Sequence, residues 1–354
     1  MVFSILENME ENNKKVVIGI SGGVDSSVAA NLLQNEGFEV VGVFLDFWEN
    51  EKNNSGFRSA KKVSKFLNIP LLKVNARKEF KKVIVNNFIR DYKRGETPNP
   101  CVWCNPNMKF KILINEMTKI GGDFVATGHY ARLKKKGENF KLLRAKDKTK
   151  DQSYFLYGLK QKQLKKIIFP LGSYLKSDVR KIARKIGLST AKRKESQDIC
   201  FISDANFSDF LKMYIKNNKG DIIDMDGNIL GKHYGLHFYT IGQRKGINIG
   251  GKGPYYVIDK NSKKNYLIVS NDRNNLYSDK FLIKKINWIN KNLKLPLRVK
   301  LKIRYHSDFV YGIIKEQENG GYLVDLEKRQ KAITTGQSAV FYLKNEVIGG
   351  GIIV

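Results

Sequence analysis

The sequence is poor in cysteine and in acidic side chains. Its 354 residues include only three cysteines, which excludes a framework of disulfide bonds. Asp and Glu number 34 against 64 Lys and Arg, which gives a formal net charge of +30. This excess is larger than solubility requires, although a lysine-rich genome could produce part of it. It predicts a polyanionic partner, and nucleic acid is favoured over a membrane because no basic amphipathic anchor is found.

Long apolar runs are also absent. No run approaches the length needed to span a membrane. The segment Met1 to Lys15 carries three glutamates and has no long apolar centre, so we expect neither a signal peptide nor a transit peptide. We therefore expect a soluble cytoplasmic protein. The length of the chain and its 42% content of hydrophobic residues predict two or three domains with substantial cores.

A third absence concerns the glycine-rich segment at residues 18–27, Ile-Gly-Ile-Ser-Gly-Gly-Val-Asp-Ser-Ser, which lacks the lysine of a P-loop. The segment follows a short apolar strand and precedes a run with apolar residues at helical spacing. Converging backbone N–H groups and the helix dipole make such a turn an anion site. Asp25 is placed to hold a magnesium ion, and Ser21 and Ser26 offer hydroxyls. An ordinary glycine turn in a strand–helix–strand unit is the alternative.

This Ser-Gly-Gly-x-Asp-Ser form resembles the PP-loop of N-type ATP pyrophosphatases. The resemblance implies that the loop binds the pyrophosphate end of ATP, with Mg²⁺, while an oxygen atom of the substrate attacks the α-phosphate. The implied chemistry is adenylation with loss of pyrophosphate. Leu45, at the end of a strand, flanks the adenine by position or belongs to the core. The residues expected to contact the nucleotide are Gly19, Ile20, Ser21, Gly22, Gly23, Val24, Asp25, Ser26, Leu45 and Gly128.

Strand and helix patterns alternate from residue 15 to about residue 127. This alternation predicts a doubly wound parallel α/β sheet covered on both faces, with ligands at the carboxyl ends of the strands. A loop with three prolines, at 95–107, is expected to present side chains in fixed positions. The expected strands are at 16–18, 40–45, 69–74 and 123–127, and the expected helices at 28–34, 55–68, 79–93 and 109–120.

The second half of the chain changes in character. An amphipathic helix is expected at 174–186 with Ser177 as its N-cap, and another helix at 206–215. Asp226-Gly227 marks a hairpin between short strands. Apolar residues alternate with Arg and Lys at 297–305, which predicts a strand whose basic face suits a phosphate backbone or is simply solvated. The expected domains are the α/β domain at 1–205, a β-rich central domain at 206–277 and a C-terminal β-barrel at 278–354.

Several further motifs occur in one order along the chain. They are Thr-Pro-Asn-Pro at 97–100 with Cys-Asn at 104–105, Thr-Gly-His-Tyr at 127–130, Lys-Asp-Gln-Ser-Tyr-Phe-Leu at 150–156, Cys-Phe-Ile at 200–202, Gly-Gln-Arg-Lys-Gly at 242–246, Thr-Gly-Gln-Ser-Ala-Val-Phe-Tyr at 335–342 and Gly-Gly-Gly-Ile-Ile at 349–353. Together they resemble the tRNA-specific 2-thiouridylase (MnmA/TrmU) family over nearly the whole chain. The resemblance implies a tRNA uridine 2-sulfurtransferase that adenylates the C2 oxygen of the wobble uridine and then replaces that oxygen with sulfur. It also implies two partners: tRNA, with acceptors for Lys, Glu and Gln, and a sulfur donor such as a cysteine desulfurase or a sulfur-relay protein.

The three cysteines admit three interpretations. Cys101 and Cys104, with a fourth ligand such as His129, could form a zinc site, but structural zinc usually has two paired sets of ligands and only one pair exists. Sulfur transfer by thiol chemistry is the second interpretation. For it, the resemblance implies Cys200 as the persulfide carrier and Cys104 as the partner that forms a disulfide with it. Related sequences often have Asp in place of Cys101, so the third interpretation is a 4Fe–4S cluster held by Cys101, Cys104 and Cys200 with one iron open.

The resemblance also implies which residues contact the RNA. Pro106 stands where relatives tend to have Lys, so one basic contact is expected to be missing. His129 contacts the RNA or is a satisfied structural histidine. Competing functions are a PP-loop amidotransferase or ligase, which needs neither placed cysteines nor this charge, and a non-catalytic RNA-binding protein. The implied contacts are Asn99, Pro100 and Cys101 at the target base, and His129, Lys150, Asp151, Gln152, Arg304, Tyr305 and Gln337 elsewhere on the tRNA.

Overall fold

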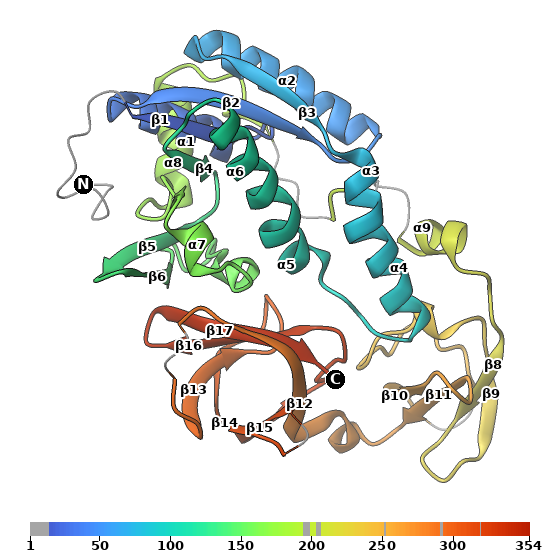
Figure 1. Cartoon of the computed structure of the whole chain (residues 1–354). Helices are drawn as coiled ribbons and strands as arrows, with labels where there is room; N and C mark the ends of the chain where they lie inside the picture. Colours follow the sequence, from blue (N-terminus) through green and yellow to red (C-terminus); the bar gives the residue numbers. More distant parts are fainter. Residues whose placement is uncertain (1–13, 194–198, 203–206, 251–252, 291–292, 319) are drawn as a thin grey trace.

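A computed structural model describes residues 14–193, 199–202, 207–250, 253–290, 293–318 and 320–354. They form a parallel sheet with its helices, a barrel, and a smaller group of strands beside the barrel (Figure 1). Most of the segment expected to be neither signal nor transit peptide lies outside the described residues. The domain boundary expected at residues 205 and 206 also lies outside them.

Five parallel strands form the sheet of the N-terminal domain, in the order β3-β2-β1-β4-β7. Val16 on β1 pairs with Val40 on β2 and with Phe124 on β4. The chain order therefore runs in opposite directions on the two sides of β1. The carboxyl ends of β1 and β4 form the switch point at which open α/β sheets bind their ligands. The strands are β1 (Lys15–Gly19), β2 (Glu39–Asp46), β3 (Leu71–Asn75), β4 (Phe124–Thr127) and β7 (Ile167–Ile168).

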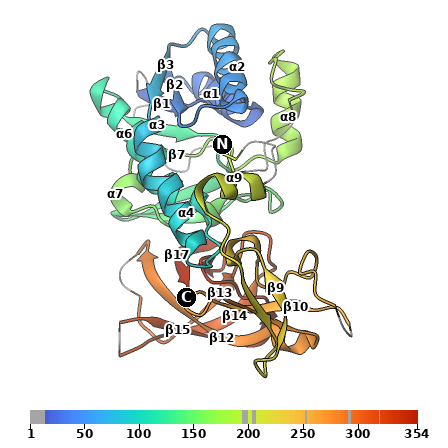
Figure 2. The ribbon, with the colours of Figure 1, turned by 90° about the vertical axis from the view of Figure 1, so that its right-hand side faces the viewer.

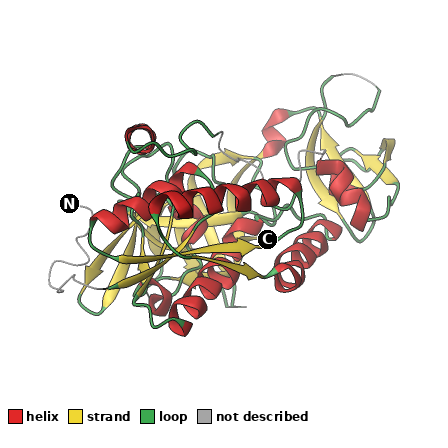
Figure 3. Ribbon diagram, turned by 90° about the horizontal axis from the view of Figure 1, so that it is seen from above, coloured by secondary structure: helices red, strands yellow, loops and turns green. Residues whose placement is uncertain are grey.

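Helices cover both faces of this sheet (Figure 3). Successive residues of β1 point to opposite faces: Val16 and Ile18 join the core under α1, α2 and α8, and Val17 joins the core under α6. This arrangement confirms the doubly wound α/β fold. The helices are α1 (Val24–Asn35), α2 (Glu51–Leu67), α3 (Arg77–Phe80), α4 (Asn86–Lys93), α6 (Phe110–Lys119), α7 (Gln161–Leu164) and α8 (Lys176–Lys185), and the π-helical turn η1 (Lys81–Val85) joins α3 to α4. Within the part of the chain that the structure describes, no helix combines the length and the apolar character needed to cross a membrane.

The prediction of a loop at 95–107 is wrong for the second half of this segment. Helix α5 occupies Pro100–Cys104, and the π-helical turn η2 (Asn105–Lys109) joins it to α6. Pro100 stands at the first helical position, where its fixed φ favours a helix and its missing N–H would have had no intrahelical partner. The side chain of Asn99 caps the helix by accepting a hydrogen bond from the backbone N of Cys101 at 3.2 Å.

Other elements also differ from expectation, and strand β7 was not predicted. Helix α8 begins at Lys176 with Leu175 as its N-cap, so the prediction of Ser177 as the cap is wrong. An antiparallel hairpin, β5 (Ala131–Lys136) and β6 (Asn139–Arg144), was not predicted, because its run of lysines hides the alternation of a strand. Strand β6 pairs with β17 of the barrel, so this hairpin links the N-terminal domain to the C-terminal one.

Four strands and one helix form the central group. The strand order is β10-β11-β8-β9, and Asp226-Gly227 lies between β8 and β9, as predicted. Ile222, Val257 and Leu267 are buried in its core. The elements are α9 (Phe207–Tyr214), β8 (Gly220–Ile223), β9 (Ile229–His233), β10 (Tyr256–Asn261) and β11 (Tyr266–Ser270).

The C-terminal strands close into a six-stranded antiparallel barrel, in the order β12-β15-β14-β13-β16-β17, with β12 paired to β17. On β13, Val299 and Leu301 are buried in the barrel core and Arg298 is exposed, as the alternation predicted. The barrel lies below the α/β domain, with the central strands alongside (Figure 2). The strands are β12 (Tyr277–Trp288), β13 (Leu297–Lys302), β14 (Val310–Glu316), β15 (Tyr322–Lys331), β16 (Ser338–Leu343) and β17 (Glu346–Ile353).

Candidate active site

The glycine-rich turn follows β1 and lies at the switch point of the sheet. Gly22 has a φ of +78°, and a Cβ there would lie 2.2 Å from the carbonyl oxygen of Gly56 on α2. Only glycine fits a left-handed backbone with so close an approach. The Ser59 hydroxyl donates to the carbonyl oxygen of Gly22 at 2.8 Å. The turn is therefore held against α2.

Two serines and a second glycine complete the turn. The backbone N of Ser21 donates to Ser26 Oγ at 3.2 Å, and Ser26 Oγ donates to the carbonyl oxygen of Gly23 at 3.1 Å. Gly128, just beyond β4, packs so closely that a Cβ there would lie 2.7 Å from the backbone N of Ser26. The turn leads into α1, whose first N–H groups have no intrahelical acceptor. Residues of the expected nucleotide set from both β1 and β4 thus meet at one place.

Some residues expected at the nucleotide offer no side chain to it. Ile20 and Val24 are buried, and the backbone N of Ile20 already donates to the carbonyl oxygen of Val43 at 2.8 Å. Gly19 ends β1 and packs against Leu113. Leu45 is half-buried against the cores on one side of the sheet. These residues shape the site through the backbone and through packing.

The carboxylate of Asp25 is bound by two side chains from distant segments. Lys176 Nζ, at the start of α8, lies 2.7 Å from both Oδ1 and Oδ2. The Tyr130 hydroxyl donates to Oδ1 at 2.8 Å. Asp147 accepts a hydrogen bond from the backbone N of Lys176 at 2.9 Å, and this fixes the start of the helix. Lys176 was not predicted from the sequence, because it lies 151 positions from Asp25 and belongs to no local pattern.

A second cation contacts the glycine turn itself. Arg193 Nη1 donates to the carbonyl oxygen of Gly22 at 3.0 Å, and Nη2 donates to Ser55 Oγ at 3.1 Å. Arg193 lies in the basic stretch that leads to Cys200. Two cations from the region after residue 170 therefore surround a turn that contains none.

Cys200, from a distant segment of the chain, approaches the two cysteines of α5. Cys101 and Cys104 are one turn apart on α5, a spacing that places both on one face of the helix. Cys200 lies near enough that a charge on its thiolate raises the pKa of Cys104. Asn50 Nδ2 donates to the carbonyl oxygen of Cys200 at 3.4 Å, so this residue also approaches the start of α2. Cys101 and Cys200 are exposed, and Cys104 is buried.

Burial is the main influence on the thiols of α5. It raises the pKa of Cys104 well above its usual range, and crowding by protein atoms also raises the pKa of Cys101. The Lys109 ammonium acts in the opposite direction on both thiols, because a positive charge favours a thiolate. Lys109 is therefore the electrostatic partner of the cysteine helix.

His129 connects Lys109 to the end of β4. Its Nδ1 lies 2.7 Å from Thr127 Oγ1, and its Nε2 lies 3.5 Å from Lys109 Nζ. Burial and the Lys109 charge hold the pKa of His129 well below its ordinary value, so the ring is neutral. An ammonium can only donate, so Nε2 accepts and the Nδ1–H donates to Thr127. The ring contacts observed here are those of a satisfied histidine.

The described residues do not form a ready metal site. Among them, no three or more His, Cys, Asp or Glu side chains are grouped so as to hold a metal ion. His129 is engaged by Thr127 and Lys109 rather than directed with the cysteines at one point. The observed positions therefore fit neither a zinc site nor a three-cysteine iron–sulfur cluster.

Several residues expected at the tRNA make structural contacts within the protein. Asp151 accepts from Arg144 Nε at 2.8 Å, and Gln152 Oε1 accepts from the backbone N of Tyr130 at 3.0 Å. Gln337 Nε2 donates to the carbonyl oxygen of Thr97 at 2.7 Å, which ties the barrel to the segment before α5.

The remaining expected contacts lie near the surface. Arg304 is exposed, and Lys150 is half-buried. Tyr305 lies beyond the end of β13. Its ring packs at a tilt against that of Phe155, from the motif at 150–156, with 4.4 Å between the ring centroids. Arg304 and Tyr305 thus stand where the barrel meets the α/β domain.

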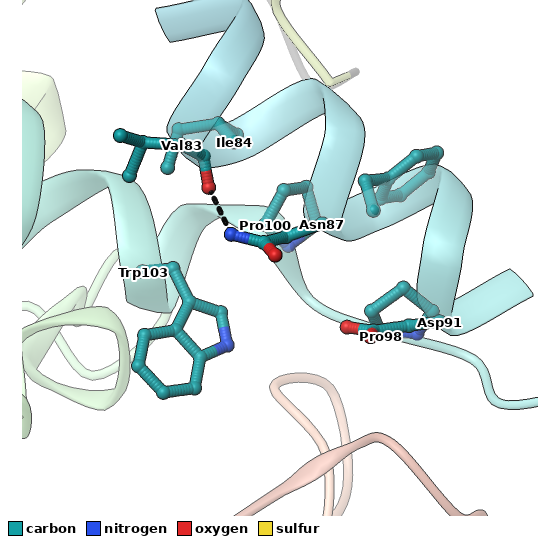
Figure 4. A pocket seen from close by; sticks show the side chains of 8 residues that line it. Val83, Ile84, Asn87, Asp91, Pro98, Pro100 and Trp103 are labelled. Atoms are coloured by element: carbon teal, nitrogen blue, oxygen red, sulfur yellow. Dashed lines mark hydrogen bonds between the residues drawn. The ribbon is translucent and has the colours of Figure 1, made fainter. Parts of the chain in front are cut away.

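A shallow groove lies beside the cysteine helix (Figure 4). Trp103, between the two cysteines of α5, is 38% exposed at its rim, and Lys285 Nζ from β12 lies 5.9 Å from the centre of its ring. The groove is lined by Val83, Ile84, Asn87, Phe88, Asp91, Pro98, Pro100 and Trp103. Two residues of the Thr-Pro-Asn-Pro motif therefore face an apolar surface next to the thiols.

Comparison with known proteins matches three family descriptions to successive parts of the chain. They are "tRNA methyl transferase HUP domain" at residues 14–204, "tRNA methyl transferase PRC-barrel domain" at 208–271 and "Aminomethyltransferase beta-barrel domain" at 278–353. The chain is 46% identical over 360 residues to the tRNA-specific 2-thiouridylase MnmA of Buchnera aphidicola subsp. Schizaphis graminum, with 98% of each chain covered. It is 42% identical over 353 residues to MnmA 1 of Geobacillus kaustophilus, with 96% of this chain and 95% of that one covered. A solved structure, the tRNA thiolase NcsA of Methanococcus maripaludis, gives a TM-score of 0.37 at 22% identity over 53% of this chain and 61% of that one, a likeness too weak to bear on function.

Proposed function

The chain belongs to the tRNA-specific 2-thiouridylase (MnmA) family, and from that premise we propose how its own residues carry out the reaction. It is a tRNA uridine 2-sulfurtransferase that uses ATP. One observation carries the assignment of residues: contacts run without a break from the glycine turn to the thiols. Gly128 packs on the turn, its neighbour His129 contacts Lys109, and the Lys109 charge acts on Cys104.

Activation of the base takes place at the turn. The C2 oxygen of uracil is a poor leaving group, and transfer of AMP to it from ATP makes it a good one. The turn between Gly19 and Ser26 would hold the pyrophosphate end of the nucleotide, and Asp25 would hold the magnesium ion that accompanies it. The uracil oxygen attacks the α-phosphorus, the bond to the bridging oxygen of the β-phosphate breaks, and pyrophosphate leaves.

Sulfur transfer takes place between Cys200 and Cys104. Cys200 receives a sulfur atom as a persulfide, and its terminal sulfur attacks C2 and expels AMP. The Cys104 thiolate then attacks the sulfur of Cys200. A disulfide forms between the two cysteines, the sulfur–sulfur bond to the base breaks, and the electron pair stays on the 2-thiouridine sulfur. External thiol must reduce this disulfide before another turnover.

The persulfide route gives Cys101 a different part from the one it would have in a cluster mechanism. Its raised pKa keeps a thiol, rather than a thiolate, near the N-terminus of α5 at neutral pH. A protonated thiol can assist the base as a proton donor where relatives have a carboxyl group. Among the described residues, no three His, Cys, Asp or Glu side chains are grouped so as to hold a metal ion. We therefore propose a persulfide route, in which Cys101 affects the rate without being required.

The target base must reach the thiols on α5. A wobble uridine must leave its stack to react, and unstacked bases are held by aromatic and apolar side chains. Asn99, Pro100 and Trp103 are placed to receive it. Lys150 and Arg304, and the central and barrel domains at 206–277 and 278–354, are proposed to bind the tRNA. A cysteine desulfurase or sulfur-relay protein is the proposed donor, and the cytoplasm is the proposed location.

The test is thiolation of unmodified tRNA with ATP and a persulfide source, followed by mass spectrometry of the nucleosides. Cys200→Ser and Cys104→Ser should each abolish 2-thiouridine while leaving ATP and tRNA binding near the wild-type values, because neither thiol is part of those sites. Cys101→Ser, one helical turn away, is the matched control and should retain measurable turnover. The thiolation assay is run anaerobically and aerobically, with and without reconstituted iron.

Three results would contradict the proposal. Wild-type protein that makes no 2-thiouridine under any of these conditions would refute the function. Normal thiolation by Cys104→Ser or Cys200→Ser would refute the assigned roles. Loss of all activity in Cys101→Ser, together with iron in the active anaerobic protein, would replace the persulfide route by the cluster.

A further inference from the structure

Lys176 is the most enclosed cation at the glycine turn. The residue is only 8% exposed, yet its Nζ lies 2.7 Å from both carboxylate oxygens of Asp25, in the first turn of α1. The Nζ also lies 5.6 Å from the centre of the Tyr130 ring. The guanidinium of Arg193, by contrast, donates its hydrogen bonds to the backbone of Gly22 and to Ser55.

Lys176 supplies the positive charge that the glycine turn lacks. The turn carries a carboxylate and no cation, although it is expected to accept a polyphosphate. A carboxylate in the first helical turn repels a phosphate unless a positive charge offsets it. In P-loop proteins a lysine of the loop itself reaches the phosphates. Here the ammonium is delivered from a helix that begins 151 positions after Asp25.

We propose that Lys176 is the polyphosphate-binding lysine of this site, and that its ammonium exchanges partners when ATP binds. In the structure it neutralises Asp25. When the nucleotide enters, Nζ turns to the phosphate oxygens and leaves the Asp25 carboxylate to the magnesium ion that accompanies ATP. The inference rests on the proposed function only in taking ATP as the nucleotide.

The residues around Lys176 allow its ammonium to change partners while its backbone stays in place. Asp147 holds the backbone N of Lys176, so the start of α8 stays in place. The Tyr130 hydroxyl holds Asp25 Oδ1 independently of the lysine. A lysine stem has four rotatable carbon units and a compact charge, so it can change acceptors without movement of the helix. The ammonium of Lys176 can therefore reach both the Asp25 carboxylate and the phosphate oxygens from one fixed backbone position.

The experiment compares ATP with adenosine, which lacks the phosphates. Binding of radiolabelled ATP and radiolabelled adenosine is measured by equilibrium dialysis with Mg²⁺ and without tRNA. Lys176→Met should weaken ATP binding by about 10- to 100-fold, the loss expected for one charge-assisted hydrogen bond. Its adenosine affinity should be unchanged. Lys176→Arg keeps the charge, so its affinity for ATP should lie between that of the wild type and that of Lys176→Met.

Lys181→Met is the matched control, since this lysine lies on the same helix with a largely exposed side chain that faces Asp178 at 4.0 Å. It should bind both ligands as the wild type does, and the thermal unfolding temperature of each variant shows that it is folded. Wild-type ATP affinity in Lys176→Met, or an equal loss of ATP and adenosine binding, would overturn the proposal. The assay contains no tRNA and no sulfur source. A protein that failed to make 2-thiouridine would therefore refute the proposed function, while the measured affinities for ATP and adenosine would still test the role of Lys176.

Discussion

The thiol of Cys104 lies in an apolar cluster with Phe80, Phe88, Met108 and Phe201. The cluster stabilises the neutral thiol, because a thiolate would lose its hydration there. The proposed attack of Cys104 on Cys200 nevertheless requires the thiolate. Lys109 supplies the opposing influence, and its contact with the neutral ring of His129 keeps it beside the cysteine helix.

The pH dependence of sulfur release should follow from this burial. Because the pKa of Cys104 is raised above its usual 9.0, the thiolate is the minor form throughout the neutral range. Its fraction, and with it the rate of the step that frees 2-thiouridine, should rise about tenfold per pH unit from neutral pH to 9. Single-turnover quench experiments on enzyme preloaded with persulfide measure this rate.

Lys109→Met is the companion variant for that measurement. Removal of the ammonium should raise the pKa of Cys104 further, so the rate should be lower at every pH with the same slope. A rate independent of pH between 7 and 9 would show that ionisation of this thiol does not control the step.

The residues of the site that could be predicted are those that follow one another in the chain. The turn at Gly22, Gly23 and Asp25 and the pair Cys101 and Cys104 each sit in a short pattern whose chemistry is local. Lys176 and Arg193 could not be found in this way. Each contacts the turn across more than 150 positions, and no spacing in a sequence specifies such a meeting.

At the scale of elements, the same local rules gave both correct and wrong predictions. Four of the five parallel strands were predicted, because each is an apolar run between helical patterns, as at 40–45. Strand β7 was not predicted, because its two residues are too short a run to indicate a strand. Helix α5 was missed because three prolines suggested a loop, although Pro100 and Asn99 together form a favourable helix start. Pro106 has no N–H to donate within a helix, and it lies in the wider π-helical turn that continues α5.

The glycine turn allows a prediction with an internal control. Gly22 and Gly37 both have positive φ, +78° and +85°, but a Cβ at Gly22 would meet the Gly56 carbonyl oxygen, whereas nothing lies within 4 Å at Gly37. Each change to Ala carries about 1 kcal/mol of backbone strain. Gly22→Ala must in addition push α2 away from the turn. It should therefore abolish ATP binding, while Gly37→Ala should only lower the unfolding temperature slightly.

Equilibrium dialysis with ATP and thermal unfolding of both variants check this expectation. Equal ATP affinity in the two alanine variants would show that the approach of α2 to the turn is not needed for the nucleotide site.

At the scale of the whole molecule, the barrel is attached to the cysteine segment. Thr97 donates its backbone N to the carbonyl oxygen of Thr335 at 2.9 Å and accepts from Gln337 Nε2 at 2.7 Å. A Cβ at Gly336 would lie 2.8 Å from the backbone N of Thr97. The chain leads from Thr97 directly into α5. If the tRNA binds on the barrel, as proposed, these contacts would hold it at a fixed position relative to the thiols, a relation that no motif in the sequence indicates.

The net charge of +30 is expected to act through particular arginines rather than as a uniform field. Arg298 and Arg304 are both exposed, at the start and just past the end of β13. Arg298 is paired with Glu327 through Nε at 2.6 Å and Nη2 at 3.2 Å, and this carboxylate raises its pKa. The same carboxylate cancels much of its charge toward a phosphate. Arg304→Ala should therefore weaken tRNA binding far more than Arg298→Ala.

Filter binding of tRNA over a range of salt concentrations separates this effect from misfolding. Each phosphate contact that is lost lowers the slope of log K against log salt by about 0.7 to 0.9, so Arg304→Ala should bind tRNA with a shallower slope than the wild type. Arg298→Ala should keep the wild-type slope, because the guanidinium of Arg298 is already engaged by Glu327 and no phosphate contact is lost with it. Identical slopes in Arg304→Ala and the wild type would show that the end of β13 does not contact the phosphate backbone. The positive charge of the barrel would then serve solubility, and the tRNA would be held by the α/β and central domains alone.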